Sequence, residues 1–254
     1  MVAQLRPWAG FWKGTWSRRE NLGGFQFPIE VITLGLVMVA VPYFATNNIA
    51  SIYLGTVWDQ EIGLDREIPV LNWTILPYAL LYLFYPVTLL VRPSGERGDA
   101  ELLVGMQTLI MATAFCCLIF LVLPAEIDLR DQIDWDSMNS WELALFEFIH
   151  QSDNPWNAWP SLHIVHSYLL ARLMTFWVSR KAETQLAWRV FLVVLWVEWA
   201  LLSISILTTK QHYLFDLVTG IAFAQFAWMA TKPTLDEIGE MGPSAFAEKC
   251  GWTD

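Results

Sequence analysis

Two histidines and an aspartate in this chain have types and spacing that suit nucleophilic chemistry. His212 and Asp216 are four residues apart, so in a helix they share one face, and the carboxylate can accept a hydrogen bond from one imidazole nitrogen. The other ring nitrogen is then available to attack an electrophile, and a second histidine, His163, can donate a proton to a leaving oxygen. These groups suit in-line transfer of a phosphoryl group.

Phosphoryl transfer also needs hydrogen-bond donors for the phosphate oxygens. The candidates are Lys210, Arg130 and the hydroxyl of Ser161, together with the backbone amides at the start of the helix that begins near Pro160. Proline suits the first turn of a helix, where an N–H group would have no partner. An alternative for Lys210 is a side chain that only reaches toward the membrane interface.

The other two histidines suit supporting roles. His166, three residues after His163, is expected to pack or to form a supporting hydrogen bond, and His150 to lie at an interface. Three histidines in one region could bind a metal ion, but no HExxH sequence or cysteine-rich spacing accompanies them. We therefore predict a site with no metal and no cofactor.

Long apolar runs predict the elements that must position these residues. Hydrophobic residues make up 55% of the 254 residues and charged residues only 16%, and four uncharged gaps are 18 to 28 residues long. A helix of that length crosses a bilayer. The predicted fold class is all-α, a polytopic membrane bundle of six transmembrane helices with interfacial amphipathic helices. The six spans are expected at about residues 30–47, 69–91, 101–124, 160–179, 187–208 and 212–231.

Composition excludes several classes of protein. A net charge of −10 would repel a polyanion, so no nucleic-acid partner is expected. The low charge content does not fit a disordered chain or a secreted or cytosolic globule. Cys116 and Cys117 are adjacent in an apolar run and Cys250 stands alone, so no disulfide framework is implied.

The distribution of lysine and arginine predicts the orientation in the membrane. The N-terminal segment and two alternate loops carry nine of these residues, and the segments between them carry three. The nine are Arg6, Lys13, Arg18, Arg19, Arg92, Arg97, Arg180, Lys181 and Arg189, and the three are Arg66, Arg130 and Lys210. Both termini are therefore expected in the cytoplasm. His163 and His212, at the start of the fourth and sixth spans, are then both on the noncytoplasmic face.

Three regions follow from these spans. Residues 1–28 are predicted to form a cytoplasmic amphipathic segment, because Trp8, Trp12 and Trp16 recur every four residues among basic residues; the alternative is a disordered basic arm. Residues 29–231 form the transmembrane catalytic domain, and residues 232–254 a solvated cytoplasmic tail. A further amphipathic helix is expected at 138–150, on the outer face.

Two charged residues interrupt the fourth and fifth spans. Arg172 and Glu198 fall at broadly similar depth, and an isolated charge there costs roughly 2.5–3.5 kcal/mol on insertion scales. We expect the two to pair across adjacent helices, with a polar substrate or proton path as the alternative.

Two segments resemble motifs of a known family, the type 2 phosphatidic acid phosphatase superfamily, which includes lipid phosphatases, lipid phosphotransferases and vanadium haloperoxidases. Residues 160–163, PSLH, resemble its PSGH motif, and the segment from Ser205 through His212 to Asp216 resembles its SRxxxxxHxxxD motif. Leu162 stands where the family has glycine, Ile206 stands where it has arginine, and no KxxxxxxRP motif precedes them. The variants PSLH and HYxxD are similar to those of the branch that contains inositol phosphorylceramide synthases.

The resemblance implies a lipid phosphatase or head-group phosphotransferase. In the family mechanism His212 is the nucleophile that forms a phosphohistidine, Asp216 orients it, and His163 protonates the leaving alcohol and then activates the acceptor. Arg130 would be the better candidate for a contact with the phosphate, and Lys210, two residues before His212, would take over the charge of the missing family arginine. The substrate would be a membrane lipid, either a lipid phosphate or a phospholipid, and the acceptor either water or a lipid alcohol. The alternative is a transporter or structural bundle whose motifs no longer act.

Overall fold

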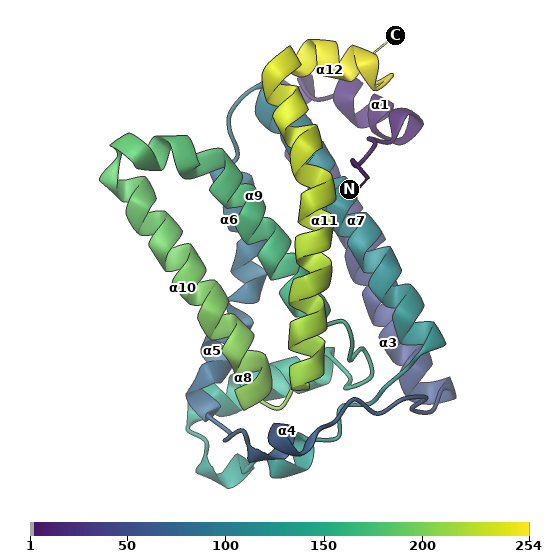
Figure 1. Ribbon diagram of the computed structural model, residues 1–254, viewed down its shortest axis with the longest axis vertical. Coiled ribbons are helices and arrows are strands. Elements are labelled where there is room, and N and C mark those ends of the chain that lie inside the picture. Colours follow the sequence, from purple (N-terminus) through teal and green to yellow (C-terminus); the bar gives the residue numbers. More distant parts are fainter. Residues whose placement is uncertain (1–2, 254) are drawn as a thin grey trace.

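A computed structural model describes residues 3–253, apart from the side chain of Arg180, and every regular element in that part of the chain is helical. The side chain of Arg180, which was counted for orientation, and residues 1, 2 and 254 lie outside this description. The long helices run side by side between two ends, and the chain passes from one end to the other in an antiparallel bundle (Figure 1). The all-α prediction is confirmed for these residues.

Five helical segments in the described part are long and apolar enough to cross a membrane. They are Gln26–Tyr53, Asn72–Val91, Glu96–Val122, Leu186–Thr208 and Leu214–Met241. The first segment consists of α2 (Gln26–Gly35), a π-helical turn (Leu36–Ala40) and α3 (Val41–Tyr53). The second consists of a 3-10 turn (Asn72–Thr74), α5 (Ile75–Ala79) and α6 (Leu81–Val91). The other three are the single helices α7 (Glu96–Val122), α10 (Leu186–Thr208) and α11 (Leu214–Met241). Each matches a predicted span, with the sixth extending ten residues past its predicted end.

The helix predicted as the fourth span forms, but it is less apolar than the other five. This helix, α9 (Leu162–Thr184), carries His163, His166, Ser167 and Arg172 within its length, and it is not among the five apolar segments. It packs against α10, α11, α6 and α7, and most of its first half is buried. A helix enclosed by other helices can carry polar groups on the faces that it turns to them.

The second apolar segment is interrupted, as its prolines indicate. The helix breaks at Leu80, between Pro77 and Pro86, into α5 and α6. Proline removes a backbone N–H donor, so a neighbouring carbonyl loses its helical partner. The break lies beside α9, and Tyr78, on the α5 side of it, is buried.

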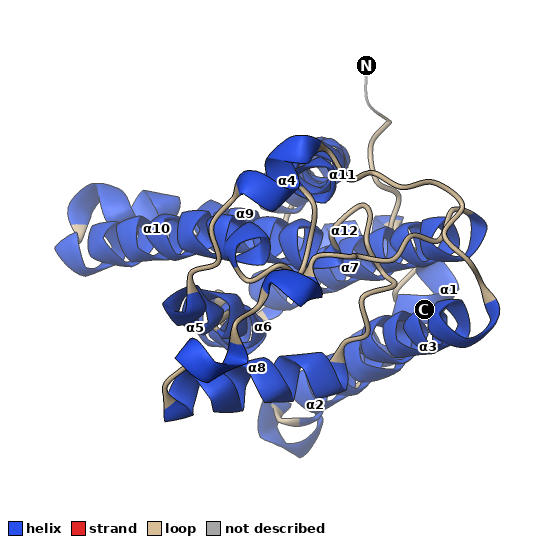
Figure 2. Ribbon diagram, turned by 90° about the horizontal axis from the view of Figure 1, so that it is seen from below, coloured by secondary structure: helices blue, strands red, loops and turns tan. Residues whose placement is uncertain are grey.

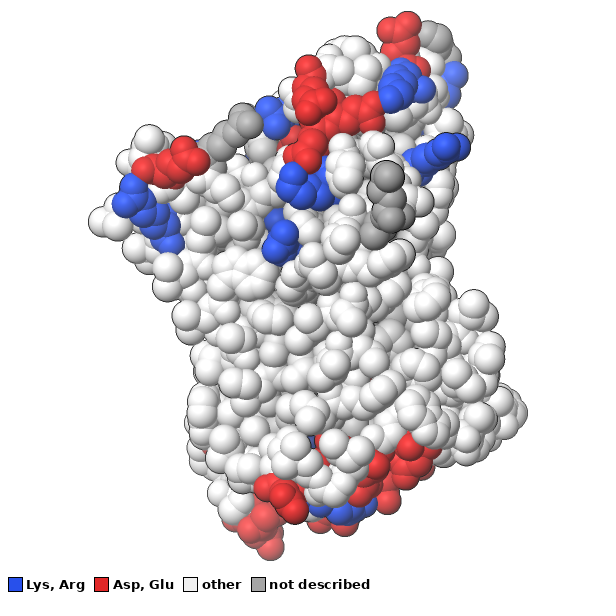
Figure 3. Space-filling view, viewed as in Figure 1, with Lys and Arg blue, Asp and Glu red and all other residues white. Residues whose placement is uncertain are grey.

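One end of the bundle is covered by loops and short helices. They are α4 (Gly63–Glu67), α8 (Ser140–Ser152) and the 3-10 turns at Arg130–Gln132 and Trp135–Ser137 (Figure 2). Helix α8 forms where a helix was expected at 138–150. At its start the Asn139 side chain accepts from the Trp141 and Glu142 amides, and the Asn139 amide donates to the Glu142 carboxylate. Acidic side chains dominate the face of this end shown in Figure 3, whereas Lys and Arg appear mainly at the other end, with an uncharged band between.

The opposite end is a packed cap built from both ends of the chain, and here the structure departs from the sequence prediction. Helix α1 (Ala9–Ser17) packs against the residues that follow α12 (Pro243–Lys249): Trp16 lies on Trp252, with ring centroids 5.5 Å apart. Trp12 is fully buried and donates to the Gln107 carboxamide of α7 at 2.9 Å. The tail is therefore not a solvated extension. Two of the three tryptophans assigned to a membrane surface are buried in protein, because Trp12 contacts α7 and Trp16 packs on Trp252.

The predicted pairing of Arg172 with Glu198 does not form. The Arg172 guanidinium lies over the rings of Tyr168 and Trp228, 5.9 and 5.2 Å from their centroids. One oxygen of Glu198 is buried without a hydrogen-bond partner in the part of the chain that the structure describes. Aromatic faces on α9 and α11 thus take the place of the expected carboxylate, since they attract a cation without requiring a second charge in the bundle.

Candidate active site

His163, His212 and Asp216 meet at the acidic end of the bundle. Nδ1 of His212 lies 3.2 Å from Oδ2 of Asp216, and Nε2 of His212 lies 3.2 Å from Nδ1 of His163. All three side chains are buried. The structure therefore brings together the three residues that the motif spacing singled out.

A tight turn between α10 and α11 presents His212. The backbone amides of Gln211 and His212 both donate to the carbonyl of Ile206, and Lys210 adopts a left-handed conformation with φ of 58°. Asp216, in the first turn of α11, stabilises the start of this helix, because its carboxylate accepts from the Tyr213 amide at 2.9 Å as well as from His212. One carboxylate thus fixes both the start of the helix and the orientation of the imidazole.

Ser161 and the first turn of α9 present His163. Ser161 is the N-terminal cap of α9 and fully buried, and no described residue forms a hydrogen bond with its hydroxyl. Its carbonyl lies against Gly220 of α11, where a Cβ atom would be 3.1 Å away, so glycine permits the close approach of the two helix starts. The unpartnered hydroxyl and the amides of this turn are donors near the two histidines.

The hydrogen-bond partners assign the proton positions on the rings. Because Asp216 is an acceptor, Nδ1 of His212 carries a proton, and Nε2 of His212 offers a lone pair. Nδ1 of His163 then donates to that lone pair. Nε2 of His163 then accepts a hydrogen bond from the Tyr78 hydroxyl at 2.9 Å. The nitrogen that would attack a substrate is therefore unprotonated.

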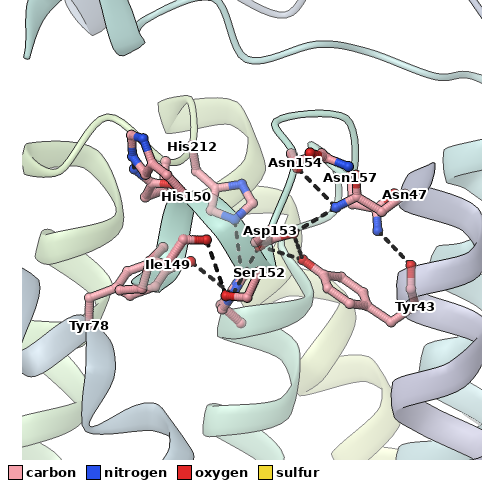
Figure 4. Close-up of polar contacts among 12 residues, drawn as sticks. Tyr43, Asn47, Tyr78, Ile149, His150, Ser152, Asp153, Asn154, Asn157 and His212 are labelled. Atoms are coloured by element: carbon pink, nitrogen blue, oxygen red, sulfur yellow. Dashed lines mark hydrogen bonds and ion pairs between the residues drawn. The ribbon is translucent and has the colours of Figure 1, made fainter. Parts of the chain in front are cut away.

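A second carboxylate, which the sequence did not single out, approaches the other side of His163. Oδ2 of Asp153 lies 3.6 Å from Nε2 of His163. The Tyr43 hydroxyl donates to both oxygens of Asp153, at 2.9 and 2.8 Å, and the Asn47 amide donates to Oδ1 at 2.6 Å (Figure 4). Each histidine thus has a carboxylate beside the ring nitrogen that faces away from the other.

Arg130 borders the same cluster. Its guanidinium donates to the backbone carbonyl of Asp153 at 2.9 Å and to the Gln211 side chain at 3.0 Å. Its Nε is buried and has no partner within the described residues. Burial lowers the pKa of Arg130, with the Asp153 charge opposing that shift. The structure therefore places this cation next to the loop segments that carry Asp153 and His212.

Lys210 is used differently from the prediction. Its side chain is fully buried, and Nζ donates to the backbone carbonyls of Asp65 and Ile68 at 2.8 and 2.7 Å. The Asp65 carboxylate in turn accepts from the Leu214 amide at the start of α11, at 2.7 Å. Lys210 thus fastens the α4 loop to the turn that holds His212, and its ammonium points at these carbonyls instead of the histidine pair.

The two remaining histidines have structural partners. Both ring nitrogens of His166 are hydrogen bonded, to Tyr85 at 2.8 Å and Thr113 at 2.9 Å. Nε2 of His150 accepts from Gln211 at 2.9 Å, and burial lowers the pKa of His150 to about 4. His166 therefore supports the bundle, whereas His150 supports the loop beside His212. No group of three or more histidine, cysteine or acidic residues in the described part is arranged to hold a metal ion.

A family model described as the PAP2 superfamily matches residues 54–230, which include His163, His212 and Asp216. The chain belongs to the PAP2 superfamily. No curated protein and no solved structure gives a significant match. Members of this superfamily are typically phosphatases or phosphotransferases, and the membership together with the apolar helices fits a lipid phosphatase in a multi-pass membrane protein.

An apolar cavity of about 450 Å³ leads away from the cluster of this PAP2 chain. Asp153 and His163 border it at one end, and aliphatic and aromatic residues of α2, α3, α6, α7 and α9 line the rest. Several lining side chains, including Ile32, Leu36 and Tyr82, are exposed on the outside of the bundle. The cavity therefore connects the histidines with the apolar lateral surface.

Sequence reasoning missed four polar residues of the site. They are Tyr43, Asn47, Tyr78 and Asp153. Tyr43 and Asn47 are four residues apart in an otherwise apolar span, a spacing that marks one polar helix face and was available as a signal. Asp153 was one of several carboxylates in an acidic segment, and only the fold distinguishes it from the others.

Proposed function

We propose that this chain is an integral membrane lipid phosphatase or head-group phosphotransferase that works through a phosphohistidine on His212. The observation that carries the proposal is the Asp216–His212–His163 contact at one end of an apolar cavity that opens laterally. The contact supplies a nucleophile and an acid, and the cavity suits the hydrocarbon part of a membrane lipid.

In this proposal α9 is a sixth membrane span. Its 23 residues are long enough to cross a bilayer, and its polar groups are enclosed by neighbouring helices. With six spans, the cap formed by both termini lies in the cytoplasm, as the distribution of Lys and Arg predicts, and the histidines face the noncytoplasmic side. Helix α8 then lies at the outer interface.

The first half-reaction transfers the phosphoryl group to the enzyme. Nε2 of His212 attacks phosphorus while the bond to the leaving oxygen breaks, and His163, protonated on both nitrogens for this step, gives its Nδ1 proton to that oxygen and remains as the neutral ring. Because the two nitrogens lie 3.2 Å apart, the phosphoryl group must enter between them and replace their contact. Asp216 holds the His212 ring and stabilises the positive charge that forms on it.

The second half-reaction releases the phosphoryl group. His163 takes the proton of the incoming hydroxyl, the oxygen attacks phosphorus, and the bond to Nε2 breaks. With water as acceptor the product is inorganic phosphate or a phosphomonoester. With a lipid alcohol the product is a new phospholipid, and the PSLH and HYxxD variants favour this head-group transfer.

Ser161, Arg130 and the first amides of α9 are the proposed phosphate-binding groups. The Ser161 hydroxyl is buried without a described partner, and the Arg130 Nε is also unpartnered. A phosphate would supply acceptors to both, and the helix N-terminus favours its negative charge. Lys210 is not included, because its ammonium already donates to two carbonyls.

The deciding experiment measures phosphate release by purified protein from a short-chain phosphatidic acid in the presence of EDTA. We expect release by the unaltered protein, and loss of release in His212→Ala and His163→Ala. His166→Gln is the matched control, since it changes a buried histidine of α9 whose nitrogens bond to Tyr85 and Thr113. Release that persists in both alanine variants would support the alternative, a transporter or structural bundle whose motifs no longer act.

A further inference from the structure

Asp153 is the only carboxylate among the described residues that lies within ion-pairing distance of His163. It follows α8 as its C-terminal cap, and its side chain is mostly buried at the mouth of the apolar cavity. The Asp153 amide donates to the Ile149 carbonyl at 2.8 Å, and Arg130 holds the Asp153 carbonyl, so the backbone is fixed on both sides.

The partners of Asp153 fit its ionised form. Tyr43 and Asn47 are both donors to the carboxylate, and no described group accepts a hydrogen bond from it. Burial raises the pKa of Asp153, whereas the Tyr43 hydroxyl and the nearby charge of Arg130 act in the opposite direction. A carboxyl group surrounded by donors has no place for a proton of its own.

His163 can use this carboxylate only when it is protonated on both nitrogens. In the neutral ring Nδ1 donates to His212, and Nε2 accepts from the Tyr78 hydroxyl. In the imidazolium Nε2 also carries a proton, which can be directed at Tyr78 or at Oδ2 of Asp153, 3.6 Å away. The carboxylate therefore interacts more favourably with the acid form of His163 than with the neutral form.

We propose that Asp153 is a positioning residue that stabilises the protonated form of His163, so that the histidine enters the first half-reaction as a general acid. The proposal rests on the proposed function. The arrangement parallels the other half of the site: Asp216 supports the ring that attacks, and Asp153 supports the ring that donates the proton. After the Nδ1 proton passes to the leaving oxygen, the neutral ring keeps its Nε2 proton, directed at Asp153, until Nδ1 takes the proton of the acceptor hydroxyl.

Other titratable and charged groups also surround His163, and the experiment must separate Asp153 from them. They are Tyr43 from α3, Tyr78 from α5, Tyr82 and Tyr85 from α6, Arg130 from the outer loop, His166 from α9 itself, His212 from the turn before α11 and Asp216 from α11. Among these, Asp216 is the one carboxylate, and it contacts the ring of His212 instead of His163.

The test compares Asp153→Asn with the unaltered protein across pH, on two substrates. On a lipid phosphate with an aliphatic alcohol as leaving group, we expect activity at pH 7 to fall about tenfold or more, because the protonated fraction of His163 decreases. The alkaline limb of the pH profile should move to lower pH by about one unit, and lowering the pH should recover activity. On p-nitrophenyl phosphate, whose leaving group needs no proton, the loss should be less than about threefold.

Two further variants keep the result interpretable. Tyr43→Phe keeps the Asp153 charge but removes a donor that partly neutralises it, so the alkaline limb should move to higher pH, the direction opposite to Asp153→Asn. This variant tests the proposal even if Asp153→Asn folds poorly. Asp136→Asn makes the same change of charge at an exposed position on the same end, and should leave the profile unchanged. An Asp153→Asn loss that is equal on both substrates and at every pH would overturn the role of Asp153, and would leave the proposed function standing. Failure of the proposed function would instead appear as phosphate release that does not depend on His212.

Discussion

The imidazole rings of His163 and His212 are in direct contact, with 3.2 Å between Nδ1 of the first and Nε2 of the second, although 49 residues separate them in the chain. Each ring is oriented from its far side, His212 by Asp216 and His163 by Tyr78. The contact therefore marks the gap where a phosphoryl group would enter, because both nitrogens that face it are suited to the transfer, one by its lone pair and one by its proton.

The first prediction concerns the carboxylate behind the nucleophile. Asp216→Asn should keep the helix start, because the amide oxygen can still accept from the Tyr213 amide, but kcat for phosphate release should fall about 100-fold or more. The asparagine cannot supply the negative charge that stabilises a positively charged His212. The measurement is phosphate release with a melting curve in detergent.

Asp236→Asn provides the matched control. Asp236 also forms an i,i+4 pair with a cation on α11, the exposed Lys232, but at the opposite end of the helix. The kcat of the Asp236→Asn variant should equal that of the unaltered protein. Equal losses in the two variants would contradict an orienting role for Asp216.

The second prediction separates two cations that the sequence treated alike. Lys210→Met removes two charged hydrogen bonds to backbone carbonyls and should lower the free energy of unfolding by about 3 kcal/mol or more, with KM unchanged in the folded protein. Arg130→Gln should instead raise KM for a lipid phosphate about tenfold, because it removes a proposed phosphate ligand. Steady-state kinetics and melting curves on the same preparations measure both effects. A larger rise of KM in Lys210→Met than in Arg130→Gln would return Lys210 to the phosphate site.

The contrast between these cations shows how far the sequence alone reaches. His212 and Asp216 are only four residues apart, so their proximity could be predicted, although the structure places His212 in the turn before α11 and not on the helix. The alternation of Lys and Arg predicts that His163 lies at the same end. The direction of the Lys210 ammonium depends on the α4 loop, which lies over 140 residues earlier in the chain. Such a long-range contact leaves no periodic pattern to read.

The same distinction explains the two termini and α9. Trp12 and Trp16 have the spacing of a membrane-surface helix, but the residues that cover them, Trp252 and Gln107, are distant in sequence. Helix α9 has fewer apolar residues than its neighbours because α6, α7, α10 and α11 surround it. Apolar periodicity predicts that a face is buried, whereas tertiary packing decides whether lipid or protein covers it.

The third prediction concerns pH and the loop beside His212. His150 has a pKa of about 4 in the folded protein because it is buried, below its ordinary value of 6.5. The unfolded chain therefore takes up a proton first as pH falls, so the stability that the neutral ring contributes is present above pH 6.5 and is lost toward pH 4. Protonation would also place an N–H group against the Gln211 amide donor.

Melting curves of the protein in detergent at pH 7.5 and pH 5 test this expectation. The melting temperature of the unaltered protein should be lower at pH 5 than at pH 7.5. The decrease should be smaller in His150→Asn, because asparagine does not titrate in this range. The matched control is Asn48→His, which introduces a histidine at an exposed position and should leave the slope unchanged. An identical pH slope in the unaltered protein and His150→Asn would contradict the assignment.

The fourth prediction tests the cap formed by the two termini. Trp252→Ala should lower the free energy of unfolding by about 3–5 kcal/mol, because it removes a buried ring that packs on Trp16 and Phe246 and donates to the Trp8 carbonyl. The histidines lie at the other end of the bundle, so kcat below the melting temperature should stay within about twofold. Chemical denaturation in detergent and phosphate release are the measurements. If the tail were solvated, Trp252→Ala would leave the unfolding midpoint unchanged. Thr253→Ala, at an exposed neighbouring position, is the control and should leave the midpoint unchanged.

The fifth prediction asks whether the apolar cavity holds the hydrocarbon part of the substrate. Ala40 lines the cavity, so Ala40→Trp should fill part of it. Each CH₂ group that loses its buried position costs about 0.8 kcal/mol, and the loss of two should reduce kcat/KM about tenfold for a long-chain lipid phosphate. A soluble ester such as p-nitrophenyl phosphate has no chain to place there, and its kcat/KM should stay within about twofold.

The neighbouring residue supplies the control for that experiment. Val41 is exposed on the outside of the same helical segment and does not line the cavity, so Val41→Trp adds the same ring to the surface of the bundle. It should leave the ratio of long-chain to soluble activity unchanged. If Ala40→Trp reduces activity on both substrates equally, the ring has disturbed the histidines and the cavity is not the chain-binding site. If Ala40→Trp lowers activity on the long-chain lipid and leaves activity on the soluble ester unchanged, the lipid reaches His163 through the lateral opening between α2, α3 and α6.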